Sequence, residues 1–179
     1  MTIRCYNSAV LSRVRELIRD VPDFPQPGVL FRDLTPVLAD AQAYRRVVDG
    51  LVEHAAGAEL VVGIEARGFV LGGAVAQALG LGVVGVRKPG KLPMVAHRAE
   101  YSLEYGTATL ELPDGVLPAG SRTFVVDDVL ATGGTLAAAC ELVERAGGVV
   151  TCLAVVVELA GLGGRSNLEG RRLAALLTL

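Results

Sequence analysis

The chain has few of the cysteine and histidine residues that form disulfides or metal sites in small domains. It contains no tryptophan, two histidines and three cysteines, and no two cysteines form a CxxC pair. An odd number of isolated cysteines argues against a disulfide framework or a structural zinc site. Cys140 and Cys152 are therefore interpreted as small core residues, and a reducing cytoplasm is the expected location.

Long apolar runs and a strong charge of either sign are also missing. The longest uncharged stretch, residues 71–86, is interrupted by glycines and Gln77, so no membrane span is expected although the mean hydropathy is +0.47. The arginines near the N-terminus are not followed by an unbroken apolar block, which argues against a secretory signal. A net charge of −2 gives no basic field for nucleic acid. We expect neither a membrane nor a nucleic acid as partner.

Apolar residues make up 51% of the chain, and 22 residues are glycine. Their pattern predicts an α/β protein. Helices are predicted over 8–20, 35–56 and 69–79 and after residue 135, with Ser8 and Thr35 as N-caps and Pro36 in the first turn. Strands are predicted over 59–64, 82–86, 107–112, 123–126, 149–157 and 172–179. Nearly continuous apolar strands alternating with helices predict a doubly wound, mostly parallel sheet flanked by helices, in one domain spanning residues 1–179.

Two segments are predicted to lack regular structure. Three prolines exclude helix and strand from residues 21–28. Residues 92–106 show no clear period, and a connection of that length inside a compact domain is typical of a mobile lid or binding loop. On spacing alone, Glu104 within it is a surface carboxylate, and neither His54 nor His97 has a partner for a catalytic triad.

The most informative stretch follows the predicted strand 123–126. Asp127 and Asp128 place two carboxylates at the strand end, and a turn of small residues then leads into an apolar helix; the turn comprises Ala131, Thr132, Gly133, Gly134 and Thr135. Small residues allow close approach of the backbone to a ligand, and amides at a helix start bind anions. Carboxylates suit sugar hydroxyls or a hydrated metal. An Asp-Asp pair by itself fits solvated carboxylates equally well, but the turn and helix that follow favour a phosphorylated sugar.

A basic turn follows the predicted strand 82–86. Residues 85–92 nearly match the phosphate-binding pattern G-x-x-x-x-G-K-[ST], but Leu92 offers no hydroxyl to Mg²⁺ and Pro89 removes an amide, so we reject a nucleoside triphosphatase. The turn still carries three cations, Arg87, Lys88 and Lys91. They suit a polyanion, although a solvated basic turn is the alternative.

A third polar turn, Glu65-Ala66-Arg67-Gly68, follows the predicted strand 59–64. Taken alone it is compatible with a surface ion pair. Ligands of doubly wound sheets bind beyond the carboxyl ends of the strands. The three clusters 65–68, 87–91 and 127–135 all fall at such ends, and this coincidence is stronger evidence than any single motif.

Residues 125–135 resemble the phosphoribosyl pyrophosphate (PRPP) motif of the type I phosphoribosyltransferases. Within that superfamily the similarity is greatest to the adenine phosphoribosyltransferase family, in the segments 23–33, 63–69, 87–93, 101–106 and 158–165. The resemblance spans about residues 8–168; Pro89 inside the basic turn and residues 94–100 depart from it. It implies a pentosyltransferase of purine salvage that converts adenine and PRPP to AMP and pyrophosphate with Mg²⁺, and a homodimer.

The resemblance also implies a role for each cluster. Asp127 and Asp128 would hold the ribose hydroxyls, and residues 131–135 the 5′-phosphate. Pyrophosphate would bind to Glu65, Ala66, Arg67, Arg87, Lys88 and Lys91, and adenine to Leu30, Phe31 and Arg32 in a small N-terminal hood of about residues 8–36. Glu104, on the lid of about residues 92–106, would act as general acid or base on the purine, with Arg67 as a second catalytic residue. Mg²⁺ would be held mainly through PRPP.

Two alternatives stay open at this point. One is a PRPP-dependent transferase for another base, such as hypoxanthine or xanthine, against which the segment 29–33 favours adenine. The other is a PRPP-sensing regulator without catalysis. Such regulators usually carry an additional nucleic-acid-binding domain and a basic surface, and neither is evident in this sequence.

Overall fold

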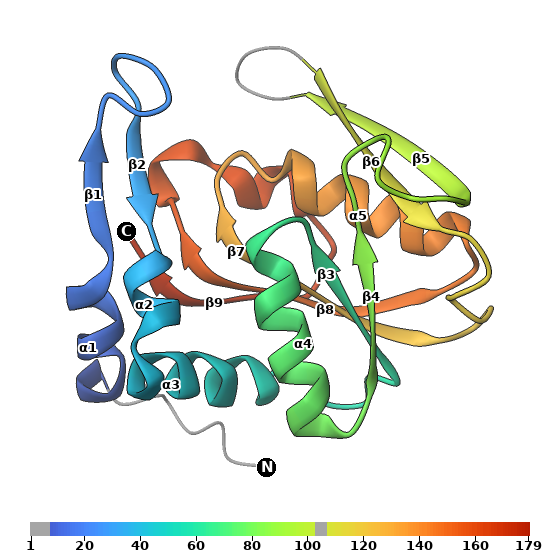
Figure 1. The fold of residues 1–179 in the computed structure, drawn as a ribbon, viewed down its shortest axis with the longest axis horizontal. Coiled ribbons are helices and arrows are strands. Elements are labelled where there is room, and N and C mark those ends of the chain that lie inside the picture. Colours follow the sequence, from blue (N-terminus) through green and yellow to red (C-terminus); the bar gives the residue numbers. More distant parts are fainter. Residues whose placement is uncertain (1–7, 103–106) are drawn as a thin grey trace. The chain divides into compact units, whose positions relative to one another are not determined.

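The computed structural model describes residues 8–102 and 107–179 (Figure 1), and the chain divides into two compact units after Gly50. The first unit contains two short strands and helices, and the second contains the main sheet. The assignment of residues 8–36 as a base-binding hood stays a prediction. No helix of the described residues is long and apolar enough to cross a membrane.

The first unit begins with the predicted helix, which a β-hairpin follows. The hairpin was not predicted from the sequence. Its elements are α1 (Ser8–Leu17), β1 (Arg19–Pro22) and β2 (Leu30–Asp33). The predicted helix 8–20 thus ends three residues early, and the predicted irregular loop begins only after β1. The strands are antiparallel, and the directly opposed Asp20 and Arg32 form a cross-strand ion pair. This pairing between residues twelve apart outweighs the local helical pattern.

The predicted helix 35–56 is two helices, α2 (Thr35–Ala39) and α3 (Ala41–Val52). Asp40 adopts an extended backbone between them, and its Oδ1 accepts hydrogen bonds from the amides of Gln42 (3.1 Å) and Ala43 (2.8 Å). An aspartate in this position caps a new helix. The Ala43 amide is also the main cause that lowers the pKa of Asp40. Thr35 is not the N-cap of α2; Leu34 is, and Pro36 lies in the first turn as predicted.

The second unit is built on a five-stranded parallel sheet, in the order β4-β3-β7-β8-β9 (Figure 1). Its elements are β3 (Leu60–Ile64), α4 (Arg67–Leu79), β4 (Gly82–Val86), β7 (Arg122–Leu130), α5 (Gly134–Arg145), β8 (Val149–Glu158) and β9 (Leu173–Thr178). Helix α4 leads from β3 outward to β4, and α5 leads from β7 outward in the opposite direction to β8. Right-handed crossovers in opposite directions place the two helices on opposite faces. The predicted doubly wound sheet is confirmed, with its switch point between β3 and β7.

The central strands of the sheet are buried because helices cover both faces. Val61, Val62 and Ile64 of β3 and residues 124–126 of β7 have no exposed surface. Such burial explains the continuous apolar runs of the sequence. Strand β7 is longer than predicted and includes Asp127, which pairs with Val155 of β8, so the two aspartates lie within the strand rather than beyond it.

An antiparallel hairpin, β5 (Val95–Ser102) and β6 (Thr107–Pro113), packs against α5. The expectation that residues 92–106 lack regular structure is therefore wrong for β5. Among residues 95–101 of this strand only Ala99 is fully buried, while Arg98 and Glu100 are exposed, so its apolar signal is weak. Glu104 lies outside the described residues, and the lid role of this segment stays a prediction.

Candidate active site

Three of the predicted clusters lie at one edge of the sheet. Strands β4, β3 and β7 are adjacent and parallel, so the turns that follow β3 and β4 and the end of β7 share the same side. Two sets of contacts join the clusters directly: Glu65 contacts the basic turn after β4, and Arg67 contacts Asp128 on β7.

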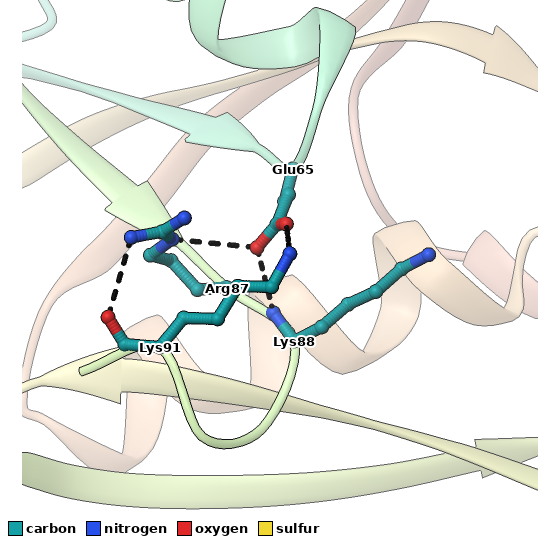
Figure 2. A network of polar contacts seen from close by, with 4 residues as sticks. All are labelled: Glu65, Arg87, Lys88 and Lys91. Carbon is teal, nitrogen blue, oxygen red and sulfur yellow. Dashed lines mark hydrogen bonds and ion pairs between the residues drawn. The ribbon is translucent and has the colours of Figure 1, made fainter.

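Glu65 organises the basic turn, as Figure 2 shows. Its Oε2 accepts hydrogen bonds from the Lys88 amide (3.0 Å) and from Arg87 Nε (3.3 Å), and its Oε1 accepts one from the Lys91 ammonium. The Lys91 hydrogen bond is the main cause that lowers the pKa of Glu65. Only 8% of the Glu65 side chain is exposed, and its carboxylate oxygens contact Arg87, Lys88 and Lys91, so Glu65 is an internal partner of the turn; its predicted contact with pyrophosphate stays a prediction.

Further contacts fix the cations of the turn. Arg87 lies over the Phe69 ring at 5.7 Å and donates from Nη1 to the carbonyl of Lys91 (3.2 Å). Its amide and carbonyl pair with those of Glu111 on β6 at 2.9 and 2.7 Å. The Lys88 side chain instead extends away from Glu65 (Figure 2), and its ammonium forms no ion pair with any described residue. The turn therefore offers one extended cation and two that are held in place.

Arg67 links this turn region to the carboxylates of β7. Its Nε lies 2.6 Å from Asp128 Oδ2, and 10% of the Asp128 side chain is exposed. Within residues 8–102 and 107–179, Asp128 Oδ2 accepts no aligned hydrogen bond, so the contact is electrostatic. A Cβ on Gly68 would lie 2.9 Å from the Val126 carbonyl oxygen. Glycine at this position thus allows the start of α4 to approach β7.

Asp127 is a buried carboxyl beside a second carboxyl. Its Oδ1 accepts a hydrogen bond from the Asp128 amide at 2.9 Å, and 8% of the residue is exposed. Burial raises the pKa of Asp127 well above its ordinary value, and the neighbouring charge of Asp128 raises it further. A group of this kind holds a hydroxyl by hydrogen bonding more readily than it carries an isolated charge.

The small-residue turn after β7 has the features of an anion site. Gly133 has a φ of +86° and is the N-cap of α5, without a side-chain cap. The first amides of a helix have no partner within the helix, and they favour negative charge. Thr135 lies in the first turn of α5, and the Thr132 carbonyl oxygen accepts a hydrogen bond from Asn167 Nδ2 at 2.7 Å. Sequence reasoning missed Asn167, because nothing distinguishes it from other polar residues of its segment.

The remaining predicted residues are placed as follows. Leu30, Phe31 and Arg32 lie on β2 of the first unit, where Leu30 is 46% exposed and the Phe31 ring packs edge-on against Phe24. Ala66 is exposed, and its peptide bond with Glu65 is cis. The roles of these residues, and that of Glu104, stay predictions.

The raised pKa of Asp127 predicts how its substitution changes stability with pH. The folded state binds this proton more tightly than the unfolded chain does, so the stability it contributes is complete below the ordinary pKa of 3.8 and is lost as pH rises through the folded pKa. Asp127→Asn removes the charge and retains the Oδ1 acceptor. We expect a higher Tm than in the wild type at neutral pH, by roughly 2–4 °C for each kcal/mol gained.

The gain should shrink as the pH is lowered toward about 3–4, where the wild-type carboxyl is protonated in both states. Thermal unfolding followed by circular dichroism across this pH range measures it. Asp114→Asn, on the exposed connection after β6, is the matched control and should leave Tm unchanged. A variant that is less stable than the wild type at neutral pH would contradict the buried, proton-binding environment.

Known proteins share both the sequence and the geometry. A family profile described as the phosphoribosyl transferase domain matches residues 37–168. An adenine phosphoribosyltransferase of Saccharopolyspora erythraea is 61% identical over 170 residues, covering 95% of this chain and 93% of that protein. The crystal structure of an adenine phosphoribosyltransferase from Rhodothermus marinus superposes with a TM-score of 0.91 at 45% identity, covering 97% of this chain and 100% of the other.

A third relative has been solved with bound molecules. The adenine phosphoribosyltransferase of Saccharomyces cerevisiae, in complex with adenine and an imino-altritol bisphosphate, has a TM-score of 0.87 at 36% identity and covers 93% of this chain and 98% of the other. The matched domain contains the strand ends at which the cationic turns, the aspartate pair and the glycine turn meet. The chain therefore belongs to the adenine phosphoribosyltransferase family.

Proposed function

We propose that this chain transfers the 5-phosphoribosyl group from PRPP to adenine, producing AMP and pyrophosphate in purine salvage. The observation that carries the proposal is the contact of Arg67 with Asp128, 2.6 Å apart. It joins the turns suited to pyrophosphate to the carboxylates suited to ribose, at the switch point of the sheet where ligands of such folds bind.

Departure of pyrophosphate is assisted by cations. The bond between C1′ and the pyrophosphate oxygen breaks as positive charge develops on the ribose, so the negative charge of the leaving group needs stabilisation. Arg67, Arg87, Lys88 and Lys91 supply it electrostatically. Glu65 and Phe69 hold the side chain of Arg87 in advance, so little reorganisation is needed when the charge develops.

The other half of PRPP is held by β7 and the turn that follows it. Asp127 and Asp128 bind the ribose 2′ and 3′ hydroxyls, and the amides of residues 131–135 bind the 5′-phosphate at the start of α5. Mg²⁺ would be held mainly through PRPP, and Asp127 and Asp128 would hold the ribose hydroxyls directly or through the waters of the metal. When bound, Mg²⁺ neutralises charge on the pyrophosphate.

The base side of the site rests on the sequence motifs and on the relatives. Leu30, Phe31 and Arg32 bind adenine, with Phe31 stacking on the purine ring. Glu104 transfers a proton at the imidazole nitrogen of the base, and closure of the lid excludes water and protects PRPP from hydrolysis. The Saccharomyces cerevisiae relative, solved with adenine, supports this choice of base.

The resemblance further supports a homodimer in the cytoplasm, in which the basic turn reaches toward the second subunit. Cys140 and Cys152 are buried free thiols, as a reducing compartment permits.

Base selectivity is the direct test of this function. The protein, incubated with PRPP and Mg²⁺, should form AMP from adenine and little product from hypoxanthine, guanine or xanthine, as measured by chromatography of the nucleotides. Product from hypoxanthine or guanine but none from adenine would overturn the assignment of the base. PRPP binding without turnover on any base, together with DNA binding at physiological salt, would instead favour a regulator.

Glu104→Gln tests the proposed general acid or base. The amide cannot transfer the proton, so kcat should fall by about 100-fold or more. PRPP affinity, measured by calorimetry, should be unchanged because Glu104 acts on the base. Glu100→Gln, an exposed carboxylate on β5, is the control and should leave kcat near its wild-type value. Near-normal turnover of Glu104→Gln would remove Glu104 from the catalytic residues.

Glu65→Gln tests whether an internal carboxylate prepares the basic turn. The change removes the negative partner of Lys91 and Arg87 without altering the size of the side chain. Pyrophosphate and PRPP should bind about three- to tenfold more weakly, the scale of one ordinary hydrogen bond, while ribose 5-phosphate binds as before. Glu59→Gln, before the other end of β3 and paired with Arg122, is the matched control. Tighter pyrophosphate binding by Glu65→Gln would show that Glu65 competes with the ligand for these cations.

A further inference from the structure

The connection between β8 and β9 contains two short 3₁₀ turns, η1 (Ala160–Leu162) and η2 (Gly164–Leu168), in place of an α-helix. The second lies against the glycine turn that precedes α5. None of the roles derived above involves η2, yet its backbone lies so close to the turn that a Cβ on Gly164 would clash with it. These contacts indicate a role in holding the turn.

Two glycines permit this approach. A Cβ on Gly164 would lie 2.2 Å from the Ala131 carbonyl oxygen and 2.8 Å from Leu130 Cδ1. A Cβ on Gly133 would lie 2.3 Å from the Gly164 carbonyl oxygen. The two backbones therefore pack directly on each other, with no room for a side chain between them.

The same contacts fix which way the amides of the turn point. In a planar trans peptide the carbonyl oxygen of one residue and the amide hydrogen of the next point in opposite directions. The Ala131 oxygen lies against Gly164, and the Thr132 oxygen accepts the hydrogen bond of Asn167 Nδ2 at 2.7 Å. The amides of Thr132 and Gly133 consequently point away from η2, as an anion site at the start of α5 requires.

Two anchors hold η2 in position. Arg165 forms a bidentate pair with Glu158 at the end of β8, with Nε and Nη2 each 2.7 Å from a carboxylate oxygen. Such paired hydrogen bonds fix orientation as well as distance. Leu168 is 3% exposed and belongs to the hydrophobic core. The segment is thus tied to the sheet at one residue and to the core at another.

We propose that Gly164 and Asn167 are positioning residues for the ribose 5-phosphate half of PRPP, acting through the carbonyl groups of Ala131 and Thr132. The proposal rests on the assignment of residues 131–135 to the 5′-phosphate under the proposed function. Neither residue touches the substrate. Each orients the amides that do.

The first test compares two glycine substitutions in the same connection. Gly164→Ala should displace the Ala131 carbonyl and weaken ribose 5-phosphate binding about tenfold or more, the scale of an overpacked contact. Gly161→Ala is the matched control, because its Cβ meets nothing within 4 Å. Neither glycine has a positive φ, so the comparison isolates the steric effect. Calorimetry with ribose 5-phosphate and separately with Mg²⁺-pyrophosphate measures both halves of the site.

The second test keeps the proposal falsifiable if Gly164→Ala does not fold. Asn167→Ala removes one exposed hydrogen bond and should weaken ribose 5-phosphate and raise KM for PRPP about threefold, with KM for adenine unchanged. Asn167→Asp has no side-chain donor for the Thr132 carbonyl, so it should weaken ribose 5-phosphate binding and raise KM for PRPP at least as much. The control is Ser166→Ala, because the Ser166 hydroxyl donates to the Gly163 carbonyl at 2.8 Å, within the same connection and away from the turn carbonyls of Ala131 and Thr132.

The expected pattern is selective loss of ribose 5-phosphate affinity with pyrophosphate affinity unchanged. An equal loss of both ligands would show general structural damage and overturn the proposal. Thr135→Ala separates the positioning role from the assignment of residues 131–135 to the 5′-phosphate. If Thr135→Ala weakens ribose 5-phosphate binding while the Gly164 and Asn167 variants do not, the positioning role is wrong and the phosphate assignment stands. If no variant weakens ribose 5-phosphate binding, the positioning role and the phosphate assignment are both wrong.

Discussion

The close packing of α4 on β3 and β7 is the constraint on which the site depends. A Cβ on Gly63 of β3 would lie 2.6 Å from the carbonyl oxygen of Gly68, and one on Gly68 would lie 2.9 Å from the carbonyl oxygen of Val126. Glycine at both positions brings the first turn of α4 against the switch point of the sheet, the place where the helices of a doubly wound fold diverge. Arg67 begins this helix, so the same packing brings its guanidinium to Asp128. The glycines of this region are therefore determinants of the site as much as of the fold.

The carboxylates of the site have two different tasks, and their surroundings separate them. Glu65 is surrounded by Arg87, Lys91 and the Lys88 amide, which lower its pKa and keep it ionised as the partner of the basic turn. Asp127 is buried beside another carboxyl, which raises its pKa and favours its neutral form. A multiply charged anion such as PRPP would be repelled by three ionised carboxylates. The raised pKa of Asp127 acts against that repulsion, and its carboxyl keeps an oxygen that can accept a hydrogen bond.

The parts that the sequence predicted well are those with a local signature. Continuous apolar runs identified β3, β4 and β8, and the polar clusters that contain Arg67, Arg87 and Asp127 lie at one edge of the sheet as expected, while their roles stay predictions. The errors concern elements that exist because of distant partners: β1 pairs with β2 through Asp20 and Arg32, and β5 pairs with β6 through Arg98 and the buried Glu111. The internal role of Glu65 follows from the pairing of β3 with β4, and that of Asn167 from a contact 35 residues away. No periodicity in a single sequence contains that information.

The two halves of the site are supported by different parts of the second unit, and this division has a mechanical consequence. The ribose 5-phosphate half rests on η2, which Arg165 and Glu158 tie to the end of β8. The basic turn rests on Glu65 and on the paired backbone groups of Arg87 and Glu111, so a displacement of β6 is transmitted to the turn. Strand β6 pairs with β5, which lies within the predicted lid of about residues 92–106. The cations of the basic turn and strand β6 are therefore joined in one hydrogen-bonded assembly, while Asp127 and Asp128 are held separately in the parallel sheet.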